Sequence, residues 1–144
     1  MTTYPVRTCF HEAGHAVVAA ALGLEVQNIC INKDESGKTD VSGGSLSFIE
    51  QVACCFAGDE AQDIWHPCAD WAGSGDLQQF LTLAQGLFQE QRDALEKAGC
   101  ELARELLHKN KSHVEIVAQR LVQQGYMTGT EFKHLTGTLE PGPR

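Results

Sequence analysis

Apolar residues recur at helical spacing over most of this chain, and their pattern predicts its main elements. A first helix is expected over residues 4–22, because Pro5 suits a first helical turn and Gly23 supplies a C-terminal stop. A second helix is expected from Leu46 to Pro67, where apolar side chains return every three or four residues. The first half of the chain is therefore built on two predicted helices.

The second half has a helical pattern throughout. One helix is expected to begin near Asp76, and a long one to run over about 89–108. Two more begin at capping boxes, in which a Ser or Thr precedes a Glu by three residues: Ser112 with Glu115, and Thr128 with Glu131. Four helices are thus predicted after the loop that follows Pro67.

Between the first two helices the pattern changes to that of a β-hairpin. Residues 26–31 are short and β-branched and predict a strand, and the polar run 33–40 predicts the loop. A returning edge strand is expected to start at Val41. Residues 41–45 then either pair with the backbone of a substrate or form a plain structural hairpin, and the pattern leaves both open.

Length and composition favour one compact domain over residues 1–144, with residues 1–3 and 138–144 frayed. Hydrophobic residues make up 42% of the chain and charged residues 21%, as in globular proteins. The expected fold class is mainly α, a single helical domain with a small β-ribbon.

The charge balance narrows the classes of partner. The chain carries 11 basic and 19 acidic residues, a net charge of −8, which argues against nucleic acid or an anionic membrane as partner. Its longest apolar run falls short of the roughly 18–20 residues that cross a bilayer, and no signal-peptide pattern is present. A cytoplasmic protein with no membrane contact is expected.

Six cysteines would suit three disulfides in a secreted domain, but no pair has C-x-x-C spacing. Cys54 and Cys55 are adjacent within a helical pattern, so they cannot both face one core. Most of the cysteines are therefore interpreted as small buried residues in a reducing compartment.

The candidate chemistry lies in the first helix, where His11, Glu12 and His15 form an H-E-x-x-H motif. Residues four apart share one helix face, so the two imidazoles can bind one Zn²⁺ ion. The glutamate can then act as general base toward the attacking water. The motif predicts a zinc site with His11 and His15 as metal ligands and Glu12 as catalytic residue.

Zinc catalysis requires a third protein ligand and one open position. The residues alone leave several candidates for that ligand: Asp59, Glu60, Asp63, His66, Asp70 and Asp76. Asp76 follows a Gly-Ser-Gly turn and could equally be an ordinary N-cap. Spacing alone does not decide between Asp63 and Asp76.

Three blocks of the chain resemble the FtsH-type zinc metallopeptidase domain, in the family's order. Residues 11–19, HEAGHAVVA, resemble its metal-binding helix. Residues 56–64 resemble its GGRAAEE-type helix, and residues 72–77 resemble its GASNDL-type turn, whose aspartate is the third zinc ligand. The resemblance spans roughly residues 8–135. It implies a zincin-like, FtsH-peptidase-like fold with Asp76 as the third ligand.

Two departures from that family change the expected function. The family normally joins this domain to a membrane anchor and an AAA+ ATPase, whereas this sequence has no Walker motif, so no ATP binding is expected. Gln62 stands where the family usually has an acidic residue, and it is expected to support a ligand or the packing of its helix.

The first interpretation is an ATP-independent zinc metalloendopeptidase that hydrolyses flexible or unfolded polypeptides, with a homo-oligomer allowed. The alternative is a non-catalytic zinc-binding interaction domain derived from the same fold. An intact Glu12 favours the enzyme, because a purely structural zinc site has no need of a base.

Overall fold

A computed structural model describes residues 3–67 and 75–141 of the chain. Within these residues the elements follow one another in this order: α1 (Val6–Ala21), β1 (Glu25–Ile31), β2 (Gly37–Ser42), α2 (Phe48–Trp65), α3 (Gly75–Leu83), α4 (Gln89–Lys109), α5 (Lys111–Gln124), β3 (Tyr126–Thr128) and α6 (Gly129–Thr136). The fold is mainly helical with a small antiparallel sheet, which confirms the predicted class.

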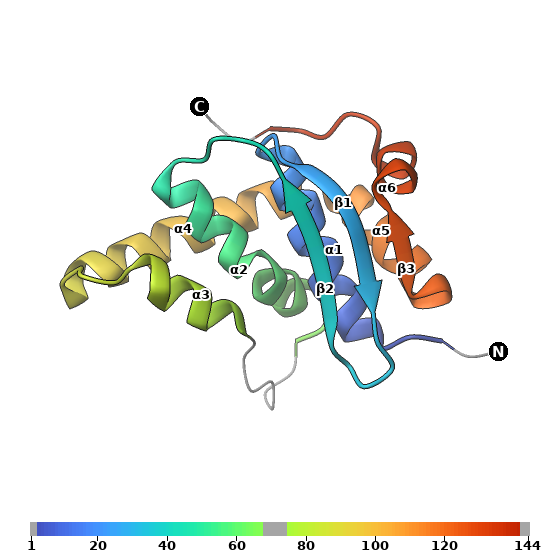
Figure 1. Cartoon of the computed structure of the whole chain (residues 1–144), viewed down its shortest axis with the longest axis horizontal. Coiled ribbons are helices and arrows are strands. Elements are labelled where there is room, and N and C mark those ends of the chain that lie inside the picture. Colours follow the sequence, from blue (N-terminus) through green and yellow to red (C-terminus); the bar gives the residue numbers. More distant parts are fainter. Residues whose placement is uncertain (1–2, 68–74, 142–144) are drawn as a thin grey trace.

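Helix α1 lies behind the sheet, between α2 and α5 (Figure 1). Most of its residues are buried, because other elements cover it on several sides. The crossing of α1 and α2 is close at Gly14, where a Cβ atom would lie 2.5 Å from the Cβ of Ala61. Glycine is therefore required at this crossing, and the close approach brings the polar face of α1 against α2.

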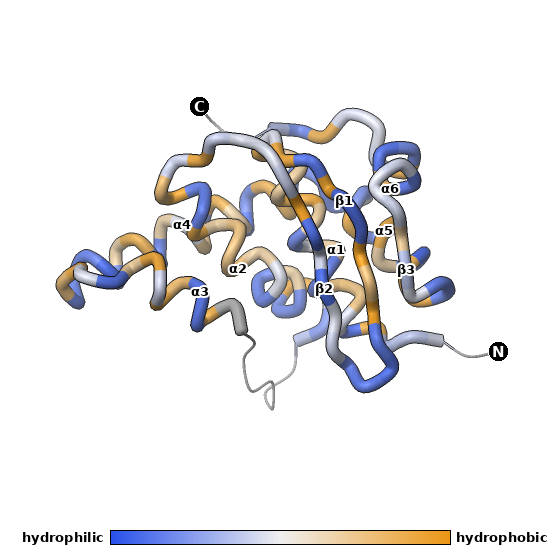
Figure 2. Tube along the Cα trace, in the orientation of Figure 1, coloured by the Kyte–Doolittle hydropathy of each residue, from blue (hydrophilic) through white to orange (hydrophobic). Residues whose placement is uncertain are grey.

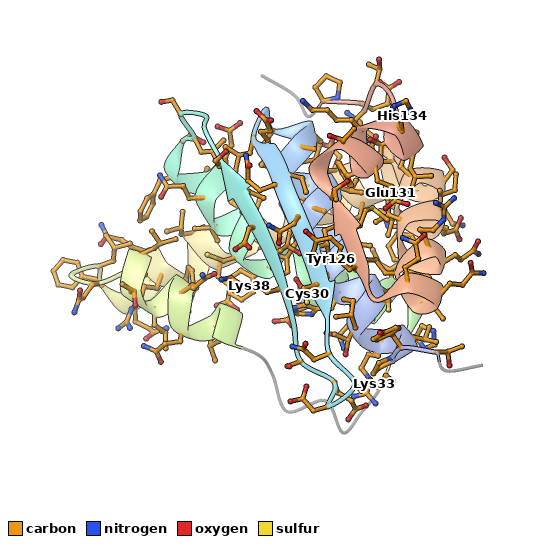
Figure 3. All side chains as sticks on the ribbon, turned by 45° about the vertical axis from the view of Figure 1, so that its right-hand side comes forward. Cys30, Lys33, Lys38, Tyr126, Glu131 and His134 are labelled. Carbon is orange, nitrogen blue, oxygen red and sulfur yellow. The ribbon has the colours of Figure 1, made fainter. Side chains whose placement is uncertain are left out.

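The sheet has the strand order β2-β1-β3, with both pairs antiparallel. Cys30 of β1 faces Lys38 of β2 on one side and Tyr126 of β3 on the other, as their side chains show in Figure 3. The turn between β1 and β2 is hydrophilic (Figure 2). Strand β2 is consequently an edge strand, with its free edge away from β1.

Two expectations about the sheet need correction. The returning strand begins at Gly37 rather than Val41, because a tight turn closed by the hydrogen bond from Asn32 N to Ser36 O replaces the longer loop. The expected two-stranded ribbon also has a third strand, β3, which pairs with β1 over only three residues. A strand of that length gives no periodic signal in the sequence.

The helix starts agree with the expectation in part. Thr128 is the N-cap of α6 and its hydroxyl accepts from Glu131 N, as predicted. The capping box at Ser112 was wrong, since α5 begins at Lys111 directly after Asn110. Glu115 instead accepts a hydrogen bond from Nε1 of Trp65, 3.1 Å away.

Buried apolar side chains form two clusters. The larger cluster surrounds α1 and draws on α2, α4, α5, α6 and the sheet. The smaller cluster joins α3 to α2 and consists of Val52, Cys55, Phe56, Phe80 and Ala84. Cys54 packs against the larger cluster, so the two adjacent cysteines serve different clusters, as predicted.

Two further expectations concerned the burial of the cysteines and membrane-spanning segments. Of the five cysteines that the structure describes, Cys9 and Cys55 are buried and the other three are partly exposed, so the expectation that most cysteines are buried does not hold for these five. Among the described helices, none combines the length and the apolar character that crossing a bilayer requires.

Candidate metal centre

The two histidines of α1 point their Nε2 atoms at one another. His11 Nε2 and His15 Nε2 lie 3.2 Å apart, as the spacing of four residues predicts. Zinc binds imidazole nitrogen at about 2.0–2.1 Å in tetrahedral geometry, which separates two such nitrogens by about 3.3 Å. The pair therefore has the separation that one shared zinc ion requires.

The opposite ring nitrogens face oxygen acceptors. His15 Nδ1 donates to the backbone carbonyl oxygen of Cys54 at 3.0 Å, and His11 Nδ1 donates to Oε1 of Gln62 at 2.5 Å. Oδ1 of Asp59 lies 3.7 Å from the same Nδ1 atom of His11. Since these acceptors hold the ring protons on Nδ1, both Nε2 atoms present lone pairs to each other. Two facing lone pairs at this distance favour a cation between them.

Helix α2 leaves room beside the imidazoles at Gly58. A Cβ atom at this position would lie 2.5 Å from Nε2 of His11 and 2.5 Å from Nε2 of His15. Glycine thus forms one wall of the space that an ion would occupy. The donor chemistry, the spacing and this cradle all fit zinc.

The carboxylate of Glu12 is held by strand β2. Glu12 is only 6% exposed, and Thr39 Oγ1 donates to its Oε1 at 2.6 Å. The same hydroxyl lies 3.2 Å from the backbone oxygen of Glu12. A Cβ atom at Gly37 would lie 3.1 Å from Oε2 of Glu12. Glu12 is therefore a positioned carboxylate rather than a freely moving surface group.

A cleft of about 550 Å³ opens beside these groups, between α1 and β2. Glu12 and His15 line its floor, β2 forms one wall, and α2 and α3 contribute to the rest. On α3, Gln79 reaches this lining. The cleft therefore borders Glu12 along the edge strand β2.

Three of the candidates for the third ligand contact side chains other than those of the two histidines. Nη2 of Arg104, on α4, donates to Oε2 of Glu60 and, at 2.8 Å, to Oδ2 of Asp63. The hydrogen bond that Arg104 donates to Asp63 is the largest cause of the raised pKa of the Arg104 guanidinium. His66 packs its ring against Phe10, with centroids 5.6 Å apart. These three candidates have partners elsewhere.

The remaining candidates are placed differently. Asp59 approaches the Nδ1 side of His11, the side opposite the Nε2 pair. Asp70 lies outside the described residues. Asp76 belongs to α3, and its side chain lies outside the part of the chain that the structure describes. Among the side chains that the structure describes, no group of three or more His, Cys, Asp or Glu is arranged to hold a metal ion. Asp76 therefore stays a prediction.

Four supporting contacts had no specific signal in the sequence: the Cys54 carbonyl, Gly58, Thr39 and Gly37. Gln62 was expected to support a ligand or helix packing, and it lies against His11. The other four depend on how α2 and β2 pack on α1, which no local pattern predicts.

Comparison with known proteins finds a family match that covers the region of the candidate metal centre. A family model described as Peptidase M50B-like matches residues 3–88. That range contains both histidines, Glu12, β2 and α2, and it ends before α4. No curated protein matches the chain.

Proposed function

The chain belongs to the Peptidase M50B-like family, and from this premise we propose that it is a zinc metallopeptidase that hydrolyses flexible or unfolded polypeptides without ATP. The observation that carries the proposal is the pair of Nε2 atoms 3.2 Å apart beside a buried, positioned carboxylate. A purely structural zinc site has no use for that carboxylate.

The family match supports a peptidase-related function. The assignment to the FtsH type is more specific than this match and stays a prediction, as do the ATP independence and the class of substrate.

In this proposal His11, His15 and Asp76 hold the zinc ion. Bound zinc supplies a Lewis acid that activates water and polarises the scissile carbonyl. Glu12 accepts the proton of the attacking water and is placed to return it to the leaving amine. Gln62 and the Cys54 carbonyl orient the two imidazoles through their Nδ1 atoms.

The assignment of Asp76 has support from its position on α3. Gln79 lines the cleft together with Glu12 and His15. Position 76 is three residues before Gln79 in the same helix. Asp63, by contrast, belongs to an ion pair with Arg104.

The metal ligands are tested by zinc content. Purified wild type should hold about one zinc per chain, and His11→Ala and His15→Ala should lose it, because two remaining ligands hold zinc poorly. Asp76→Asn should also lose zinc under dialysis, whereas the matched variant Asp63→Asn should keep it. Zinc retained by Asp76→Asn and lost by Asp63→Asn would reverse the assignment.

The catalytic role is tested with Glu12→Gln. This variant removes the carboxylate but keeps the size of the side chain, so it should stay folded and loaded with zinc. Its cleavage of unstructured casein should fall by about 10²- to 10⁴-fold relative to wild type, which is the usual contribution of a general base. Wild type should need no ATP and should stop on chelation. Zinc-loaded wild type that cleaves no unstructured substrate would favour the alternative, a non-catalytic zinc-binding domain.

A further inference from the structure

Strand β2 contacts Glu12 through two residues on one face of the strand. Thr39 donates its hydroxyl proton to Oε1 of Glu12 at 2.6 Å. Gly37 is two residues earlier, on the same face, and lies beside Cγ and Oε2 of the same side chain. A Cβ atom there would lie 2.8 Å from Cγ and 3.1 Å from Oε2 of Glu12.

The two contacts involve different oxygens of the Glu12 carboxylate. A threonine hydroxyl has one proton, and Oε1 is both nearer and more negative than the backbone oxygen 3.2 Å away. Oε1 is therefore the anchored oxygen. Oε2 lies under Gly37, where the missing side chain leaves it space, and both residues line the cleft.

We propose that Thr39 and Gly37 are positioning residues for the general base: the Thr39 hydroxyl anchors Oε1 of Glu12, and the missing side chain at Gly37 leaves Oε2 open to the attacking water. The inference rests on the proposed function for its catalytic part. It assigns to the edge strand β2 a role beyond any pairing with substrate, because the strand that borders the cleft also sets the orientation of the base.

The hydroxyl is tested with Thr39→Val and Thr39→Ser, both loaded with zinc. Thr39→Val keeps the shape and removes the donor, so kcat on an unstructured peptide should fall about 10- to 100-fold, as expected for a lost hydrogen bond to a charged group, with KM changed less than twofold. Thr39→Ser keeps the donor and should stay within about threefold of wild type. Zinc content should equal that of wild type in both. Thr138→Val, at an exposed position, is the control for a lost surface hydroxyl.

The open space is tested with Gly37→Ala. A methyl group at this position should displace the carboxylate and lower kcat by about 100-fold, with zinc retained. An unchanged kcat in both Thr39→Val and Gly37→Ala would overturn the proposal. So would equal loss in Thr39→Ser and Thr39→Val, because the hydroxyl would then not be the active feature.

A measurement without turnover separates this proposal from the proposed function. Thr39→Val should lower the Tm of the zinc-loaded protein by about 4 °C, and by less than 1 °C when Glu12→Ala is already present. Equal Tm shifts in the two backgrounds would overturn the contact, whether or not wild type cleaves any peptide. If wild type cleaves no peptide but the two Tm shifts differ, the contact between Thr39 and Glu12 is supported. Only the proposed peptidase activity is then refuted.

Discussion

The two hydrophobic clusters hold different parts of the site. The larger cluster surrounds α1 on several sides, and in it Val17, Leu107 and Leu121 are fully buried. The smaller cluster attaches α3 to α2 mainly through Phe80, whose ring lies 5.2 Å from that of Phe56. In Figure 1 α3 extends away from the sheet with the start of α4.

This difference separates a fixed part of the site from a part that is held less tightly. The histidine pair and Glu12 belong to α1, where the larger cluster permits little movement. Position 76 belongs to α3, whose side chains Leu77 and Leu81 are exposed on the outer face. We infer that the two predicted histidine ligands and the predicted base are preorganised, while the predicted third ligand depends on the docking of one helix.

The largest effect is expected from Leu107→Ala in the larger cluster. The side chain is fully buried, and its removal leaves a cavity that neighbours on several elements cannot collapse into. The free energy of unfolding should fall by about 4 kcal/mol, as measured by urea denaturation. Ala94→Val, at an exposed helical position, is the control and should change it by less than about 1 kcal/mol. A loss below about 1 kcal/mol for Leu107→Ala would contradict the rigidity of this cluster.

A smaller loss of stability but a larger loss of zinc is expected from Phe80→Ala. Only α3 must shift to fill the space, so the unfolding free energy should fall by about 3 kcal/mol, the low end for a buried Phe→Ala change. The shift moves position 76, and zinc affinity measured by chelator competition should fall at least tenfold. Leu107→Ala, measured below its unfolding transition, should keep wild-type zinc affinity. Equal zinc affinities in the two variants would remove the distinction between the clusters.

The smallest effect is expected from Cys100, which packs beside the smaller cluster. Burial, followed by the charge of Glu60, raises the pKa of its thiol from 9.0 to about 12. The unfolded thiol ionises first, so this contribution is intact below pH 9 and is lost as the pH rises toward 12. Because the side chain is half-buried, the unfolding free energy should fall with pH by only a fraction of the value for a fully buried group, which is about 1.4 kcal/mol per pH unit.

The measurement is the difference in unfolding free energy between wild type and Cys100→Ala at pH 8 and pH 10.5. Wild type should lose more stability over this range than the variant. If the two curves ran parallel, the thiol would titrate alike in the folded and unfolded chains, and the smaller cluster would not shield it.

The helices and the histidine pair were predictable because they depend on residues close together in sequence. A spacing of four residues is sufficient to bring His11 and His15 onto one face of α1. The contacts of Cys54, Gly58 and Thr39 join segments far apart in the chain, and they depend on a helix crossing and a strand register.

The errors in the fold have the same origin. The capping pattern at Ser112 is a valid local signal, but α5 begins at Lys111, directly after Asn110, whose buried amide hydrogen-bonds the backbone of Leu106 and Glu140. The three residues of β3 form a strand only because β1 is beside them. Tertiary contacts thus override short local signals in both places.

The glycine in α2 beside the imidazoles extends the motif into a longer signature. A scan for H-E-x-x-H alone accepts any helix with the two histidines, whatever lies opposite them. Relatives with a side chain at the position of Gly58 would have that space filled, since even a Cβ atom comes within 2.5 Å of both Nε2 atoms. If the proposed function holds, such relatives should be pseudoenzymes that keep the fold without the ion, and the motif and the glycine together would distinguish them from active members.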